Sequence, residues 1–125
     1  MLQEMMDKQL ELQERLGYNI DGMDTEDRAD YIKEFSIHLT QELHELLYEI
    51  PFFKKWKIYS NMTEEEISAS WAAAKKEYID MLHFMLNIGL ALGFSAEEMH
   101  DMYMSKNKEN HKRQDEGYTH DKSYR

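Results

Sequence analysis

The segment between Thr63 and Gly93 constrains the fold of this chain more than any other. Thr63 precedes three glutamates and can cap a helix, and Gly93 is a typical C-terminal stop. Two apolar stripes run between them, one made of Met81, Met85, Ile88 and Leu92 and the other of Ile79, Leu82, Leu86 and Leu90. A helix that is apolar on nearly every side must be buried on nearly every side. A four-helix monomer offers too little cover, so we expect one stripe to contact a second subunit.

Local signals predict three further helices. The first covers residues 2–16 and ends at a glycine. The second begins with Thr25 as its N-cap and covers residues 25–50, where Pro51 stops it. A Ser-x-x-Glu capping box opens the last helix, which covers about residues 95–105.

Composition favours an all-α fold. The chain has one proline and no valine, whereas leucine, methionine, glutamate and lysine are abundant. Its 125 residues, 42% of them hydrophobic, suffice for one domain with a modest core. We therefore predict a single catalytic domain over residues 1–105, a four- to five-helix bundle that forms a dimer. Residues 106–125 are predicted to be a polar phosphate-binding tail.

The composition also excludes several classes of protein. Without cysteine, the chain has no disulfide, thiolate zinc site or cysteine nucleophile. A formal charge of −10 argues against a protein that coats duplex nucleic acid. The most apolar stretch, residues 81–94, is too short to span a bilayer, and no signal peptide is visible. We expect a cytoplasmic location, with neither duplex nucleic acid nor a membrane as partner.

Two pairs of carboxylates carry the candidate chemistry. Glu42 and Glu45 are three residues apart in one predicted helix, and Glu77 and Asp80 are three apart in the next. This spacing places both members of a pair on one face of a helix. Four such groups lie together only with positive charge between them, because like charges about 4 Å apart repel by roughly 4 kcal/mol at an effective dielectric near 20. Oxygen ligands of this kind suit Mg²⁺ or Mn²⁺.

The position of the acids on their helices supports a site. In the second helix, the glutamates lie beside the expected buried stripe, which consists of Leu39, Leu43, Leu46, Leu47 and Ile50. In the third helix, a polar gap between the apolar stripes contains Glu77, Asp80, Phe84 and Asn87.

Two lysine-rich clusters, residues 54–57 and 106–113, would suit a polyanionic small ligand or be solvated ends. His83 is expected to be a hydrogen-bonded core histidine.

Four motifs resemble those of the dimeric all-α dUTPases, relatives of the MazG-like nucleoside triphosphate pyrophosphohydrolases. ELLYEIPFFKKWK is similar to the family segment that ends in P-W-K-x-W-K, with Phe53 where a tryptophan is often found. EYIDMLHF is similar to E-x-x-D-x-x-H-F, and YMSKNKENHKRQDEGY to Y-x-x-K-N-x-x-N-x-x-R-x-x-x-G-Y. Near the N-terminus, Gln13 and Leu16 match a Q-x-x-L motif in which Gly17 replaces the usual Asp or Asn.

The resemblance implies Mg²⁺-dependent hydrolysis of dUTP to dUMP and pyrophosphate by a homodimer. Two or more Mg²⁺ ions, for which Mn²⁺ could substitute, would be held by Glu42, Glu45, Glu77 and Asp80. Glu45 is our choice of general base. The expected substrate-binding residues are Gln13, Lys54, Trp56, Lys57, Phe84, Asn87, Lys106, Asn110, Arg113 and Tyr118. Among them, Phe84 would pack on the deoxyribose or belong to the core, and Gln13 would read uracil or lie on the surface.

Two alternatives remain at this stage. A MazG-like or dCTP-type pyrophosphohydrolase would share the acids and differ in base preference. A helical interaction protein would keep the fold without catalysis, although the complete set of four acids argues against it.

Overall fold

Helices account for nearly all of the described chain. The computed structural model describes residues 1–51 and 62–117, and no strand occurs in these two ranges. The elements, in order, are α1 (Leu2–Arg15), the short 3-10 helix η1 (Ile20–Gly22), α2 (Thr25–Glu49), α3 (Glu64–Leu92) and α4 (Ala96–Asp115). The predicted all-α class is confirmed.

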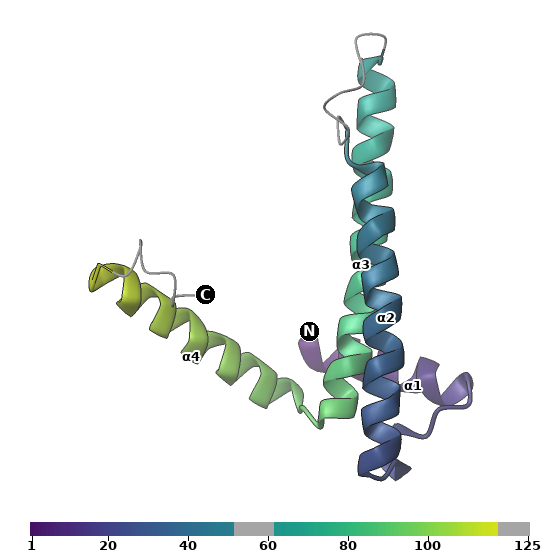
Figure 1. Ribbon diagram of the computed structural model, residues 1–125, viewed down its shortest axis with the longest axis vertical. Helices are drawn as coiled ribbons and strands as arrows, with labels where there is room; N and C mark the ends of the chain where they lie inside the picture. The colour runs from purple at the N-terminus through teal and green to yellow at the C-terminus, as the bar shows by residue number, and fades with distance from the viewer. Residues whose placement is uncertain (52–61, 118–125) are drawn as a thin grey trace.

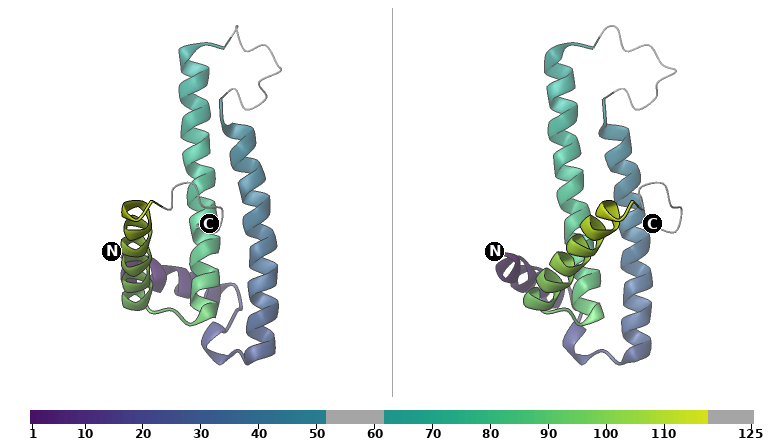
Figure 2. Two further views of the ribbon diagram at one scale, coloured as in Figure 1. Left: turned by 60° about the vertical axis from the view of Figure 1, so that its left-hand side comes forward. Right: turned by 90° about the vertical axis from the view of Figure 1, so that its left-hand side faces the viewer.

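A long antiparallel hairpin of α2 and α3 is the main body of the fold (Figure 1). α1 crosses one end of this hairpin, close to the junction between α3 and α4 (Figure 1). α4 then leaves the hairpin at a bend of 104° and projects away from it (Figure 1), so that it points toward the viewer in the right-hand view of Figure 2. No single helix in the described ranges is long and apolar enough to cross a membrane; only α3 and α4 taken together reach that length and composition.

Side-chain caps determine where the helices begin. Thr63 and Ser95 cap α3 and α4, as predicted. The prediction for α2 was wrong by one residue, because Asp24 rather than Thr25 is the N-cap. The Asp24 carboxylate accepts a 2.8 Å hydrogen bond from the backbone N–H of Asp27. A carboxylate in this position also interacts favourably with the positive end of the helix dipole.

α4 is longer than predicted and ends at Asp115 rather than near Ser105. Its second half has no apolar face, but ion pairs one turn apart lie along it. Glu109 is 2.7 Å from Arg113 and 3.9 Å from Lys106. Such pairs stabilise an exposed helix by a few tenths of a kcal/mol each. The apolar pattern was therefore a poor guide to the end of this helix.

Two apolar clusters fill the angle where α1, α2, α3 and α4 meet. The first consists of Ile20, Tyr31, Phe35 and Ala91, and the second of Met6, Leu86 and Ala96. The predicted stripe of α2 was wrong in part, because Leu43 and Leu47 are exposed. The buried side chains of α2 are aromatic and lie nearer its N-terminus, where α1 and η1 supply the cover.

Glycines shape the junction between α3 and α4. Gly93 ends α3 with φ of 88°, a left-handed conformation that strains residues with a Cβ. At Gly89, a Cβ would lie 2.9 Å from Cε of Met99, so the missing side chain lets the first turn of α4 pack on α3. These contacts fix the direction in which α4 leaves the hairpin.

Candidate metal centre and substrate site

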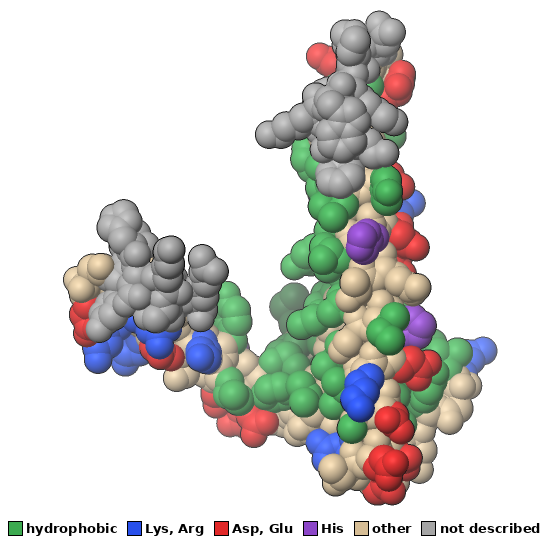
Figure 3. Space-filling view, in the orientation of Figure 1, with side chains coloured by type: hydrophobic (Ala, Val, Ile, Leu, Met, Phe, Trp, Pro, Cys, Tyr) green, Lys and Arg blue, Asp and Glu red, His purple; other side chains and the backbone are tan. Residues whose placement is uncertain are grey.

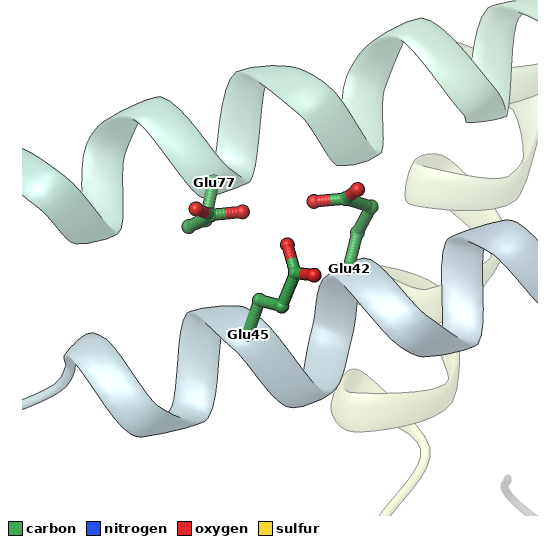
Figure 4. A group of neighbouring side chains, drawn as sticks. All are labelled: Glu42, Glu45 and Glu77. Carbon is green, nitrogen blue, oxygen red and sulfur yellow. The ribbon is translucent and has the colours of Figure 1, made fainter.

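Three carboxylates from two helices meet in the middle of the hairpin. Glu42 and Glu45 come from α2 and Glu77 from α3, and their side chains point toward one another (Figure 4). One carboxylate oxygen from each lies within 4.8 Å of the others. The i, i+3 spacing puts the two α2 glutamates on one face. Antiparallel packing of α2 on α3 then brings the third acid opposite them.

Burial and mutual repulsion disfavour ionisation of Glu42. Its pKa rises from the ordinary value of 4.5 to about 7. Burial is the largest cause, followed by hydrogen bonding of the protonated form to Glu77 and Glu45. The charges of Glu45 and Asp80 raise the pKa further. The folded cluster therefore needs additional positive charge before all of its carboxylates can ionise at neutral pH.

Two buried oxygens test whether a cation fits this cluster. Oε2 of Glu42 and Oε2 of Glu77 are buried, and neither has a hydrogen-bond partner among the described residues. Buried polar atoms without partners are uncommon and call for an explanation, such as an ion. A divalent cation bound by oxygen ligands would satisfy both atoms and remove the repulsion. The donor set therefore fits Mg²⁺ or Mn²⁺.

Asp80, the fourth predicted ligand, is exposed and is not one of the three carboxylates that meet. It lies close enough for its charge to raise the pKa of Glu42. The fold thus brings three of the four predicted acids together, with the fourth beside them.

The raised pKa of Glu42 predicts a dependence of stability on pH. Between pH 4.5 and about 7, the folded protein binds a proton that the unfolded chain has released. The metal-free protein should therefore lose stability as pH rises through this interval, and its Tm should fall by several degrees between about pH 5 and pH 8. Glu42→Gln has no group to titrate there, so its Tm should fall less. Parallel Tm profiles for the two proteins, measured with a chelator present, would contradict the assignment.

Aromatic rings lie one helical turn from the acids. The His38 ring stacks on Phe84, with centroids 5.7 Å apart and planes at 29°, and meets Phe35 edge-on at 5.4 Å. The His38 side chain is 42% exposed. Sequence reasoning missed His38, although its position four residues before Glu42 placed it on the same face of α2. Phe84 packs on the first core cluster, so it is both core and neighbour of the site.

A chain of polar side chains connects α3 to α2 through α1. Nδ1 of His83 bonds Oε1 of Gln9, Nε2 of Gln9 donates to Oε1 of Gln13 at 3.3 Å, and Nε2 of Gln13 donates to the Tyr31 hydroxyl at 2.8 Å. Gln13 is buried, with both ends of its amide bonded within the chain. His83 is hydrogen-bonded as predicted but exposed, so the prediction that it belongs to the core was wrong.

The other predicted substrate-binding residues lie in different parts of the chain, and some lie outside the described ranges. Asn87 is 2% exposed, and its Oδ1 has no hydrogen-bond partner within the described ranges. Lys106, Asn110 and Arg113 lie on α4, outside the hairpin. Four predicted residues lie outside the described residues: Lys54, Trp56, Lys57 and Tyr118.

Comparison with known proteins identifies the family. The family model described as dUTPase matches residues 1–93 and 85–118. A dCTP pyrophosphatase of Enterobacteria phage T4 is 34% identical over 140 residues, covering 94% of this chain and 82% of the relative. A dCTP pyrophosphatase of Enterobacteria phage LZ5 is 44% identical over 71 residues, covering 53% and 41%. A DNA replication protein of phage T4 is 32% identical over 130 residues, covering 86% and 33%. No solved structure matches. The chain therefore belongs to the all-α dUTPase family of nucleotide pyrophosphohydrolases.

Proposed function

We propose that this protein hydrolyses dUTP to dUMP and pyrophosphate with the help of two or more Mg²⁺ ions. The observation that carries the proposal is the cluster of three carboxylates with two unpartnered buried oxygens. Glu42, Glu45 and Glu77 would hold the ions, with Asp80 as a further ligand. Bound Mg²⁺ would neutralise charge on the phosphate oxygens. Mn²⁺ could substitute, since it accepts the same oxygen ligands.

Each side chain then has a defined task. Glu45 is the exposed member of the cluster, so it can accept the proton of the attacking water as general base. Lys106, Asn110, Arg113 and Tyr118 would bind phosphate oxygens, for which cationic donors are well suited. Lys54, Trp56 and Lys57 complete the proposed substrate-binding set.

The nucleoside would lie over the aromatic rings of Phe84 and His38. Phe84 would pack on the deoxyribose and exclude a 2′-hydroxyl group, and Oδ1 of Asn87 would gain a donor. Gln13 retains one N–H and one lone pair, which complement a carbonyl and the N3–H of uracil. Because Gln13 is buried, contact with a base requires local movement of α1 or η1.

A second candidate substrate is dCTP, which is favoured by the two relatives named dCTP pyrophosphatase. Cytosine presents a donor where uracil presents an acceptor, so an amide such as that of Gln13 reads either base according to its orientation. We place the enzyme in the cytoplasm as a homodimer, with a nucleotide as its ligand and no duplex nucleic acid or membrane as partner.

A panel of nucleotides tests the proposal. Pyrophosphate release should be fastest from dUTP, slower from dCTP and much slower from UTP, and it should require Mg²⁺. Equal turnover of dUTP and dCTP would remove the claim of specificity for dUTP. Exclusive turnover of dCTP would establish the second candidate, and no turnover of any triphosphate would reject the function.

A further inference from the structure

Four polar side chains form one continuous line of hydrogen bonds that crosses from α3 to α2 through α1. We call them the polar relay: His83 on α3, Gln9 and Gln13 on α1, and Tyr31 on α2. Gln9 and Gln13 are buried, at 3% and 2% exposed, whereas His83 is exposed on a surface of mixed character (Figure 3). Buried amides need hydrogen-bond partners, so the neighbours of each glutamine decide how it turns its oxygen and its nitrogen.

The hydrogen bonds of the polar relay all run in one direction. Nε2 of Gln9 donates to Oε1 of Gln13 at 3.3 Å, which leaves Oε1 of Gln9 to accept from Nδ1 of His83. Nε2 of Gln13 in turn donates to the Tyr31 hydroxyl at 2.8 Å. Because an amide oxygen only accepts hydrogen bonds, His83 carries a proton on Nδ1.

The relay would be equally complete with every hydrogen bond reversed. Tyr31 would then donate to Gln13, and Gln13 to Gln9. Nδ1 of His83 would be unprotonated and accept from Gln9. Burial raises the pKa of Tyr31 to about 12, so its hydroxyl keeps its proton and can donate or accept. The tautomer of His83 is thus coupled to the direction in which the Gln13 amide points.

The direction of the relay decides what Gln13 can offer to a ligand. In both directions, one lone pair and one N–H of its amide remain, but reversal exchanges their positions. Uracil presents the acceptor O4 beside the donor N3–H, whereas cytosine presents the donor N4–H beside the acceptor N3. For a base held in one place, one direction therefore complements uracil and the opposite direction complements cytosine.

We propose that the polar relay selects the base, with His83 and Gln9 as positioning residues that fix the amide of Gln13. The inference rests on the proposed function, in which Gln13 contacts the base. The members of the relay lie on α1, α2 and α3, so movement confined to η1 would leave the relay intact. Specificity for one nucleotide would then depend on a histidine that touches neither substrate nor metal.

The far end of the relay adjoins the proposed nucleoside site. The ring of Tyr31 packs on Phe35, with centroids 4.4 Å apart, and Phe35 packs on Phe84 at 5.9 Å. Phe84 is one of the two rings over which the nucleoside would lie. The hydroxyl that accepts from Gln13 thus belongs to the same aromatic cluster as the proposed contact with the deoxyribose.

Gln9→Glu tests the inference, because a carboxylate only accepts hydrogen bonds. It still accepts from His83, but it forces Gln13 to turn Nε2 toward residue 9 and Oε1 toward Tyr31. The measured quantity is the specificity ratio, kcat/KM for dUTP divided by kcat/KM for dCTP. The ratio should move by about tenfold or more toward the base that the parent disfavours. A smaller change, or a change in the opposite sense, would overturn the inference.

Two further variants separate base selection from a structural role. Gln3→Glu makes the same change at an exposed position of α1 outside the relay and should leave the specificity ratio unchanged. His83→Leu removes the donor at the exposed end of the relay, so it tests the inference even if Gln9→Glu does not fold. Its specificity ratio should fall toward one. A merely structural role would lower kcat/KM equally for both nucleotides, and an unchanged ratio in His83→Leu would overturn the inference.

Imidazole ¹⁵N spectra of the ligand-free protein test the relay without substrate or metal. At about pH 9, where imidazole groups are neutral, His83 should carry its proton on Nδ1. His83→Leu identifies its signals among those of the six histidines. A proton on Nε2 would overturn the inference, as would a parent that hydrolyses dUTP and dCTP equally well. A parent inactive on both nucleotides would instead reject the proposed function.

Discussion

Glu77→Gln should abolish nucleotide hydrolysis while the protein stays folded. The substitution removes one oxygen ligand charge from the cluster, and electrostatic stabilisation by a bound metal ion is worth several kcal/mol. We therefore expect kcat/KM to fall by about 10³-fold or more. In the absence of metal, the variant should be at least as stable as the parent, because one of three crowded carboxylates has lost its charge.

Thermal unfolding with and without Mg²⁺ separates a metal ligand from a structural residue. At about 100 times its Kd, Mg²⁺ should raise the Tm of the parent by about 10 °C. The rise should be largely lost in Glu77→Gln. Glu65→Gln is a matched control, because it removes an exposed charge from the same helix away from the cluster. Equal shifts in all three proteins would show that Glu77 binds no metal.

Arg113→Ala should lower kcat/KM by about 10²-fold, which corresponds to roughly 3 kcal/mol of transition-state stabilisation. The reason is the loss of a cationic phosphate contact. Folding stability should change little, because the pair that Arg113 forms with Glu109 is on the surface and such pairs contribute about 0–1 kcal/mol. Steady-state kinetics and thermal unfolding of the same preparation measure both quantities.

Ligands without phosphates provide the contrast for Arg113. Deoxyuridine should bind the parent and Arg113→Ala equally weakly, since it offers no anion to the guanidinium group. Truncation after Ser105 removes the whole proposed phosphate-binding segment and should have at least the effect of Arg113→Ala. Undiminished dUTP turnover by the truncated protein would contradict the role of α4.

Local sequence signals predicted the helices well because the interactions that begin and end a helix lie within a few residues. Thr63, Ser95 and Gly93 fulfil their predicted capping roles. Apolar periodicity was less reliable. It missed the end of α4, which is stabilised by ion pairs, and it placed the core of α2 on leucines although Tyr31 and Phe35 are buried.

The acidic site was also predictable in part. Spacing of three residues placed Glu42 with Glu45 on one face of α2 and Glu77 with Asp80 on one face of α3, and the structure brings Glu42, Glu45 and Glu77 within 4.8 Å of one another. The contact of Gln9 with Gln13 and the stacking of His38 on Phe84 were not predicted. The stacking depends on the relative register of α2 and α3, which no local pattern encodes.

The sequence by itself determined which side chains are available, where the helices begin and which acids lie on one face. Only the tertiary structure decided the direction of α4, through the packing of Met99 against Gly89 and the left-handed turn at Gly93. That direction separates Lys106 and Arg113 from the acids of their own chain. Helical periodicity is a property of neighbours along the chain, whereas the angle between two helices depends on contacts between side chains that meet only after folding.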